Sequence, residues 1–146
     1  MNDKPIAHTA DGRPLFDNAP TVVVVRVPHM FHHRLLAVRR ANDPGMGLLG
    51  LPGGYHMRGE SWQEAGAREV LEETGYVIDP NDMYQHGFST DEYGNNLLIA
   101  SSGVPIAYRP EGMDGEALEV HWLTMAGRPS QWAFPRHYSV AQEYLS

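Results

Sequence analysis

Three glutamates near the middle of the chain, Glu69, Glu72 and Glu73, have the spacing of carboxylates that act together on a metal ion. Positions i, i+3 and i+4 lie on one face of a helix, so a helix here points three like charges the same way. A helix selected only for stability would alternate the signs of its charges. Because the chain has no cysteine and no histidine at helical spacing to this group, hard oxygen ligands favour Mg²⁺ or Mn²⁺.

Local signals predict the helix that carries these glutamates. Ser61 and Glu64 form a capping box, in which the hydroxyl and the carboxylate satisfy backbone N–H groups at the helix start. Gly75 supplies a left-handed residue that ends the helix. We therefore predict a helix over Trp62–Thr74. Its opposite stripe is expected to pack on a core and contains Trp62, Ala65, Val70 and Thr74.

Taken alone, a glutamate-rich helix is more often a solvated face, here with an ion pair between Glu64 and Arg68. The preceding Leu51-Pro52-Gly53-Gly54 favours a functional interpretation. Two adjacent glycines after a proline let the backbone approach a ligand at the point where the helix begins. We expect this loop and the carboxylate face to converge.

The complete pattern resembles the signature box of the Nudix hydrolases. Gly54 is followed by five residues and Glu60, then by seven residues and the segment Arg68-Glu69-Val70-x-Glu72-Glu73-x-Gly75. Only Tyr76 departs from the pattern, since the family more often has Ile, Leu or Val there. The resemblance extends over about residues 21–124, and the C-terminal stretch is similar to the closing helix of the family.

The resemblance implies a metal-binding role for four residues. In the family, the glutamates at the positions of Glu72 and Glu73 bind the divalent cation. The glutamate at the position of Glu69 binds metal or acts as a base toward water. The carbonyl of the glycine before the box, here Gly53, often completes the coordination. These implied roles agree with the shared face of the three carboxylates.

Other implied roles concern positioning and a late acidic residue. Arg68 is expected to hold carboxylates in place, and Glu60 to be structural. A further acid from a late loop often supplies a ligand or the base, and Asp114, Glu116 and Glu119 are the candidates. Glu116 is preferred because it lies six residues before a tryptophan, as in similar enzymes. The predicted catalytic residues are Glu69, Glu72, Glu73, Arg68 and Glu116, and the predicted metal ligands are Gly53, Glu69, Glu72, Glu73 and Glu116.

The implied reaction is metal-dependent hydrolysis of a nucleoside diphosphate linked to another moiety X. Such chemistry needs neutralised pyrophosphate charge, an activated water and in-line attack. ADP-ribose or another nucleotide sugar, a dinucleotide and a nucleoside triphosphate all stay open as substrates. The alternative is a noncatalytic nucleotide-binding sensor on the same fold, although sensors typically lose box carboxylates. An isomerase of this fold that relies on cysteine is disfavoured by the absence of cysteine.

Length and composition predict one domain over residues 1–146, with residues 1–20 as a loose lead-in that includes one short strand. A formal charge of −7 argues against a general nucleic-acid surface. The sequence shows no signal peptide and no membrane span, which fits a cytoplasmic location. A small nucleotide-derived substrate is the expected partner. Many relatives form homodimers, but the sequence identifies no interface.

The order of elements indicates an α/β protein, and the resemblance implies a Nudix fold, an α/β/α sandwich with a mixed β-sheet. Beside the central helix we predict a closing helix over 136–145. Residues 42–50 are expected to form a loop. The expected strands cover 22–27, a half-exposed 34–40, 83–90, 97–104 and 119–123.

Several other signals are weaker. The glycine pattern at 45–50 matches a dinucleotide fingerprint, but Pro52 prevents a helix from opening there. The histidines at 29–33 fit a solvated hairpin tip better than a metal site. Trp132 and Phe134 are interpreted as core or rim packing rather than base stacking. Tyr93 lies about where dinucleoside polyphosphate hydrolases place a tyrosine, and it also suits a turn.

Overall fold

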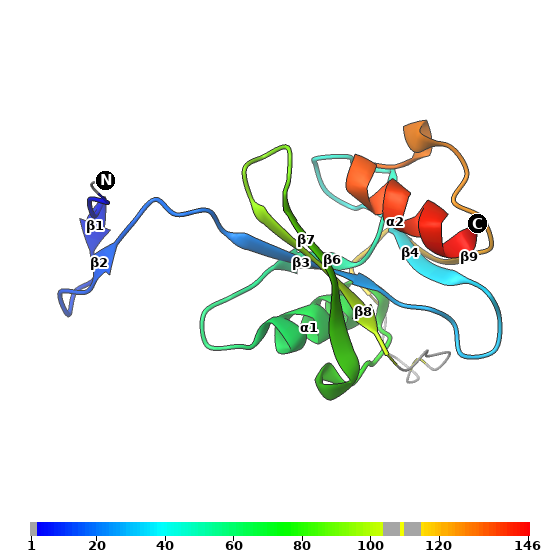
Figure 1. Cartoon of the computed structure of the whole chain (residues 1–146), viewed down its shortest axis with the longest axis horizontal. Coiled ribbons are helices and arrows are strands. Elements are labelled where there is room, and N and C mark those ends of the chain that lie inside the picture. Colours follow the sequence, from blue (N-terminus) through cyan, green and yellow to red (C-terminus); the bar gives the residue numbers. More distant parts are fainter. Residues whose placement is uncertain (1–2, 104–108, 110–114) are drawn as a thin grey trace.

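The computed structural model describes residues 3–103, 109 and 115–146 (Figure 1). Its β-strands form a four-stranded sheet of order β6-β3-β8-β7, a three-stranded sheet of order β5-β4-β9, and a two-stranded hairpin β1-β2. The elements in chain order are β1 (Ala7–His8), β2 (Pro14–Leu15), β3 (Thr21–Arg26), β4 (Leu35–Arg39), β5 (Leu49–Gly50), β6 (Gly53–Tyr55), α1 (Trp62–Thr74), the 3₁₀ turn η1 (Pro80–Asp82), β7 (Met83–Thr90), β8 (Asn96–Ser102), β9 (Glu119–Leu123), the 3₁₀ turn η2 (Pro129–Gln131) and α2 (Pro135–Leu145).

Strand β3 organises the larger sheet, which is mixed. It runs parallel to β8, with Val23 opposite Leu98, and antiparallel to β6, with Val23 opposite Gly54. The valine run of β3 is buried because both faces of this strand are covered. The pairing with β6 brings Gly53 and Gly54 into the sheet beside the helix that carries the glutamates.

Alternate residues of the strands enter two separate cores. Val24 and Ile99 pack with Val140 of α2, whereas Val23 and Val25 pack with residues of α1 such as Val70. Because side chains alternate between the two faces of a strand, the strands pack against one helix on each side (Figure 1). This is the predicted α/β/α sandwich with a mixed sheet.

Helix α1 has the predicted ends. The Ser61 hydroxyl accepts from the Glu64 N–H at 3.1 Å, and the Glu64 carboxylate accepts from the Ser61 N–H at 2.9 Å. Gly75 follows the helix with φ of 78°, a left-handed conformation. Ala65, Val70 and Thr74 are buried, and Trp62 packs against the same core. The opposite face is thereby left for the carboxylates.

Three local predictions were wrong. The second predicted strand, β4, is buried rather than half-exposed, because it is the middle strand of its sheet and its two faces enter the two cores. The predicted loop at 42–50 ends in strand β5, which pairs with β4. The lead-in holds two short strands, and this hairpin lies away from the rest of the chain (Figure 1).

The strand predicted over 97–104 is β8, and Val104 lies outside the described residues.

The remaining predicted elements, β3, β7, β9 and α2, are present within a residue of their predicted bounds. At the predicted hairpin tip, His29 Nδ1 accepts from the N–H groups of Phe31 and His32 at 3.0 and 3.3 Å, so this ring caps its own turn. Within the described part of the chain, every helix is too short or too polar to cross a membrane.

Replacing Ser61 by alanine is expected to lower the free energy of unfolding by about 1 kcal/mol, because the Glu64 N–H loses its acceptor at the start of α1. Urea unfolding followed by circular dichroism measures this change. The control is Ser139→Ala in α2, whose hydroxyl donates only to the Arg136 carbonyl within its own helix. Equal stabilities for wild type and Ser61→Ala would contradict a stabilising cap.

Candidate metal and substrate site

Two box carboxylates lie directly on the glycine pair of β6. The Gly53 N–H donates to Glu73 Oε2 at 3.4 Å. A Cβ on Gly54 would lie 2.5 Å from Glu69 Oε1, so the carboxylate occupies the space that a side chain would need. A Cβ on Gly53 would lie 2.5 Å from the Val23 carbonyl oxygen. Glycine is thus required at both positions for close approach, although neither has a positive φ.

The expected convergence of loop and carboxylates occurs, but not where the helix begins. Gly53 and Gly54 belong to strand β6, and residues 56–61 separate this strand from α1. The strand lies along the helix, so the glycines meet Glu69 and Glu73 in its second half. The expected position at the helix start was wrong because the chain forms a strand before it turns into the helix.

Arg68 connects the strand, the loop and the helix. Its Nε and Nη2 donate to the two oxygens of Glu60 at 2.9 and 2.7 Å, a bidentate pair, and Nη2 also donates to the Tyr55 carbonyl at 3.0 Å. Its Nη1 donates to Glu69 at 2.9 Å and to Glu72 at 3.2 Å. Glu60 has a pKa of about 2 because this guanidinium stabilises its ionised form. All of the side-chain donors of Arg68 are thus directed at protein groups.

Glu73 is the carboxylate with the least favourable surroundings. Burial raises its pKa to about 8, and repulsion from Glu69 and Glu116 acts in the same direction. The Gly53 N–H and the charge of Arg40 only partly offset this cost. Burial also raises the pKa of Glu69, although Arg68 opposes the shift. A cation beside Glu73 would offset both the cost of ionising a buried carboxylate and the repulsion from Glu69 and Glu116.

The late acidic residues differ in their surroundings. The Glu116 and Ala117 N–H groups donate to the Glu72 and Glu73 carbonyls at 2.8 and 3.3 Å, which fixes this segment across the end of α1. Glu116 and Glu73 line one small cavity of about 80 Å³, together with Arg40. Glu119 instead pairs with Arg39 at 3.2 Å and His121 at 2.8 Å. Asp114 lies outside the described residues.

The predicted site residues are therefore brought together only in part. Glu73 is near enough to Glu69 and Glu116 to be repelled by both, whereas Glu72 repels Glu69, is 43% exposed and pairs with Arg68. As they stand, no three histidine or acidic side chains in the described ranges are gathered to hold a metal ion. The donor set still fits a hard divalent cation, because buried carboxylate oxygens without a full counter-charge are the ligands such ions select.

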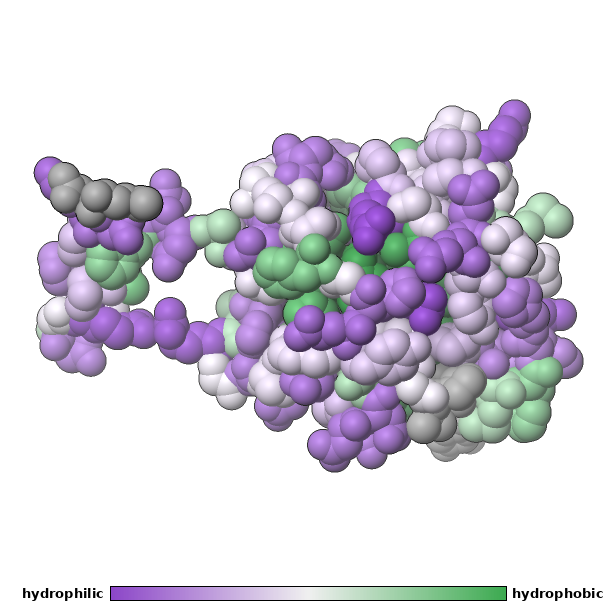
Figure 2. Space-filling model, in the orientation of Figure 1, coloured by the Kyte–Doolittle hydropathy of each residue, from purple (hydrophilic) through white to green (hydrophobic). Residues whose placement is uncertain are grey.

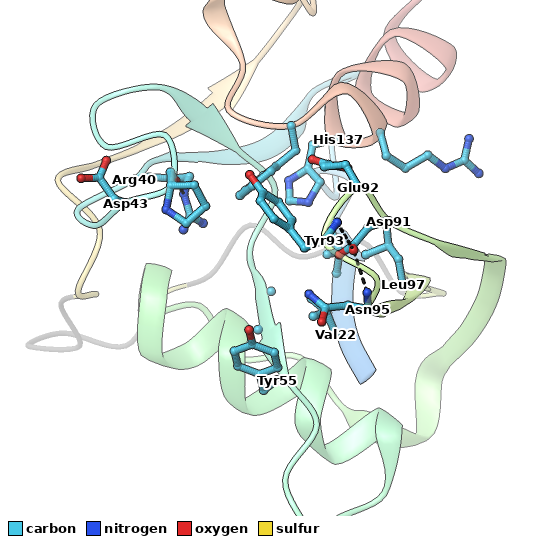
Figure 3. A pocket seen from close by; sticks show the side chains of 16 residues that line it. Val22, Arg40, Asp43, Tyr55, Asp91, Glu92, Tyr93, Asn95, Leu97 and His137 are labelled. Carbon is cyan, nitrogen blue, oxygen red and sulfur yellow. Dashed lines mark hydrogen bonds between the residues drawn. The ribbon is translucent and has the colours of Figure 1, made fainter. Parts of the chain in front are cut away.

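A cavity of about 500 Å³ opens from the glycine pair toward α2 (Figure 3). Figure 2 shows it as a hollow with apolar residues at its floor and hydrophilic residues around it. The floor comes from β3 and β8, one side from the β7–β8 turn, and another from the start of α2. Its lining residues are Val22, Val24, Arg40, Asp43, Pro44, Gly53, Gly54, Tyr55, Asp91, Glu92, Tyr93, Asn95, Leu97, Phe134, Arg136 and His137.

Two of these residues were missed by sequence reasoning. Arg40 lines both cavities, its Nε donates to the Pro44 carbonyl at 2.8 Å, and its guanidinium lies 4.8 Å from the centre of the Phe134 ring. His137 is 6% exposed on the inner side of α2. The only local signals were a basic residue after a strand and a histidine in an amphipathic helix, and neither is specific.

Aromatic residues singled out from the sequence take two different roles. Trp132 is buried and its Nε1 donates to the Ala126 carbonyl at 2.8 Å, which confirms core packing. Phe134 lies at the cavity rim. Tyr93, at the tip of the β7–β8 turn, lines the same cavity, and Asp91 orders that turn by accepting from the Tyr93 N–H at 2.9 Å. Tyr76 packs on the core, and its hydroxyl accepts from Trp122 Nε1 at 2.9 Å.

Comparison with known families now identifies the arrangement. The family described as the NUDIX domain matches residues 18–142. The chain belongs to the Nudix family. Its match spans β3 to α2, and so includes the glycine pair, the carboxylate helix and the cavity.

Solved structures share this Nudix fold at low sequence identity. A NUDIX hydrolase from Nitrosomonas europaea has a TM-score of 0.70 at 20% identity, covering 92% of this chain and 74% of that one. The NUDIX domain of Shewanella oneidensis NrtR, in complex with ADP ribose, has a TM-score of 0.70 at 22% identity, covering 88% and 87%. A bifunctional NMN adenylyltransferase/ADP ribose pyrophosphatase from Francisella tularensis, with AMP and a Mn ion, has a TM-score of 0.60 at 18% identity, covering 86% and 40%.

A curated relative shares higher identity over a shorter stretch. The ADP-ribose pyrophosphatase of Methanocaldococcus jannaschii is 42% identical over 45 residues. The match covers 31% of this chain and 27% of that protein, so it spans about a quarter of the relative's length. The likeness therefore supports membership of the Nudix family and leaves substrate choice to the site itself.

The Arg68–Glu60 pair is expected to make stability depend on pH in the acid range. Since the pKa of Glu60 falls from 4.5 to about 2 on folding, its ionised form stabilises the native state above pH 4.5. That contribution is lost as the pH falls toward 2. Thermal unfolding between pH 5 and pH 2.5 should therefore show a smaller loss of stability in Glu60→Gln than in wild type. Parallel curves for the two proteins would contradict the assignment.

Proposed function

We propose that this chain is a divalent-metal-dependent pyrophosphohydrolase acting on a nucleoside diphosphate linked to another moiety X. The observation that carries the proposal is the contact of Glu69 and Glu73 with the Gly54–Gly53 pair, at the edge of a cavity of about 500 Å³. The two glycines that the carboxylates contact also line the substrate-sized cavity. A metal ion bound by the carboxylates would therefore lie next to a substrate bound in the cavity.

The metal ligands in this proposal are Glu73, Glu69, Glu72 and Glu116, with the Gly53 carbonyl. Mg²⁺ or Mn²⁺ bound there supplies positive charge to the pyrophosphate oxygens and favours deprotonation of the attacking water. A Mn ion is present in the related Francisella tularensis structure. Support from this chain lies in the repulsion of Glu73 by Glu69 and Glu116, which a cation would offset.

The other residues of the site position these groups. Arg68 holds Glu69 and Glu72 against Glu60 and the Tyr55 carbonyl, so its role is to orient carboxylates rather than to touch substrate. Arg40 lies between the two cavities and offers positive charge to a bound phosphoryl group. Glu69 and Glu116 are the two candidates for the base that accepts the proton of the attacking water.

The proposed partner is a small nucleotide-derived molecule. Two of the related structures contain ADP ribose or AMP, which makes ADP-ribose a first candidate beside other nucleotide sugars, dinucleotides and nucleoside triphosphates. A cytoplasmic location, a single domain over residues 1–146 and a homodimer stay predictions.

Glu73→Gln is expected to lower kcat by about 100-fold or more, because the amide cannot ionise to bind the cation as the buried carboxylate would. The assay measures phosphate products from nucleotide sugars, dinucleotides and nucleoside triphosphates with Mg²⁺ or Mn²⁺. The matched control is Glu64→Gln on the same helix, because glutamine preserves the capping box. Full turnover by Glu73→Gln would refute the metal assignment.

A wild-type protein that is folded, binds nucleotides and hydrolyses none of the panel would instead favour the sensor alternative. Calorimetry with the same compounds separates these outcomes, since a sensor gives binding heat without products. The retained box carboxylates favour the enzyme.

The late acidic residue is tested by comparing two variants. Glu116→Gln is expected to lower kcat by about tenfold or more, because Glu116 shares a cavity with Glu73. Glu119→Gln should change kcat less than about twofold, because Glu119 is engaged in an exposed pair with Arg39 and His121. The reverse order would transfer the role to Glu119.

A further inference from the structure

His137 is held in one tautomer by the backbone. Its Nδ1 accepts from the Leu51 N–H at 3.0 Å, across 86 positions of sequence. A ring nitrogen that accepts carries no proton, so in the neutral ring the proton lies on Nε2. Burial, together with the charge of Arg40, lowers the pKa of His137 to about 3, so the ring is neutral at physiological pH. Nε2–H is therefore a permanent donor.

The second nitrogen of this ring opens into the large cavity. His137 lines that cavity, and no described residue accepts from its Nε2. In the described part of the chain, every side-chain nitrogen or oxygen that is sealed from solvent has a hydrogen-bond partner. Nε2 is consequently not sealed, although the residue is 6% exposed. A buried ring thus presents a single fixed donor to whatever fills the cavity (Figure 3).

The walls near His137 suit a flat ring with little charge. The Phe134 ring lies 4.7 Å from the imidazole, and Val22, Val24 and Leu97 line the same cavity. Aromatic and aliphatic walls stabilise planar heterocycles better than phosphates, which need charge or metal. One charged group also lies at this wall, because the guanidinium of Arg40 is 4.8 Å from the centre of the Phe134 ring. A guanidinium is planar and can itself stack on a heterocycle.

We propose that His137 is a nucleobase-recognition residue, whose Nε2–H donates to a carbonyl oxygen or unprotonated ring nitrogen of the substrate's nucleobase, held in the cavity beside Phe134. This inference rests on the proposed function for the orientation of the substrate. The diphosphate lies toward Gly53, Gly54 and the box glutamates, and the base lies toward α2. The base and the diphosphate of one substrate therefore occupy different ends of the cavity.

The direct test uses the full wild-type chain labelled with ¹⁵N-histidine. Long-range ¹H–¹⁵N spectra are recorded with Mg²⁺ and the α,β-methylene diphosphates of adenosine, guanosine, cytidine and uridine. Methylenediphosphonate and ribose 5-phosphate are probes that lack the base. At least one nucleotide should shift the Nε2–H resonance of His137, and neither baseless probe should. A shift caused by a baseless probe, or nucleotide binding without any shift, would overturn the proposal.

The second test is His137→Asn, because the asparagine Oδ1 can still accept from the Leu51 N–H, whereas the shorter amide cannot place its NH₂ at the position of Nε2. Calorimetry should show roughly five- to tenfold weaker binding of the best nucleotide and unchanged binding of methylenediphosphonate. The control is His8→Asn in the N-terminal hairpin, which should bind both as wild type does. Equal weakening of both ligands by His137→Asn would assign the residue to folding or phosphate binding.

These outcomes are separable from failure of the proposed function. Turnover without a nucleotide-dependent change at His137 would refute only the recognition role. Conversely, nucleotide binding that shifts His137 without any turnover would refute the hydrolase while leaving the recognition role intact. Failure of every nucleotide to bind would overturn the recognition role directly.

Discussion

The site depends on the absence of side chains at Gly53 and Gly54. A Cβ on Gly53 would collide with the Val23 carbonyl, so only glycine lets β6 pair with β3 at this point. A Cβ on Gly54 would occupy the place of the Glu69 carboxylate. The helix can therefore lay its acidic face directly on a strand of the sheet. This approach also places Glu69 and Glu73 against the two glycines that line the cavity.

This close contact buries carboxylates beside one another, and the resulting repulsion and desolvation are compensated for some of them and not for others. Arg68 neutralises the outer carboxylates through a bidentate pair with Glu60 and one hydrogen bond each to Glu69 and Glu72. Glu73, on the inner side, forms no salt bridge with any residue that the structure describes, and it is repelled by Glu69. The arginine thus fixes the outer carboxylates, whereas the inner carboxylate lacks a full counter-charge. One helix face therefore combines acids in two different electrostatic environments.

Local chemistry made much of this predictable from the sequence. The cap at Ser61, the left-handed Gly75 and the i, i+3, i+4 glutamates are determined by residues close in the chain, and the helix has the expected ends. The cavity residues were not predictable, because Arg40 and His137 reach the site through tertiary packing alone. The burial of β4 was missed for a similar reason: alternation within a strand cannot reveal that two helices cover both of its faces.

The two parts of the site differ in how much freedom their residues retain. The box residues are interlocked, since Arg68 contacts the strand, the loop and the helix at once. The cavity walls come instead from a turn ordered by Asp91 and from the first turn of α2, and each contributes side chains independently of the box. None of the hydrogen bonds that hold Arg68 to Glu60, Glu69, Glu72 and Tyr55 involves these walls. Chemistry and recognition can therefore vary separately within one fold, which is why the box identifies the reaction class and the cavity must identify the substrate.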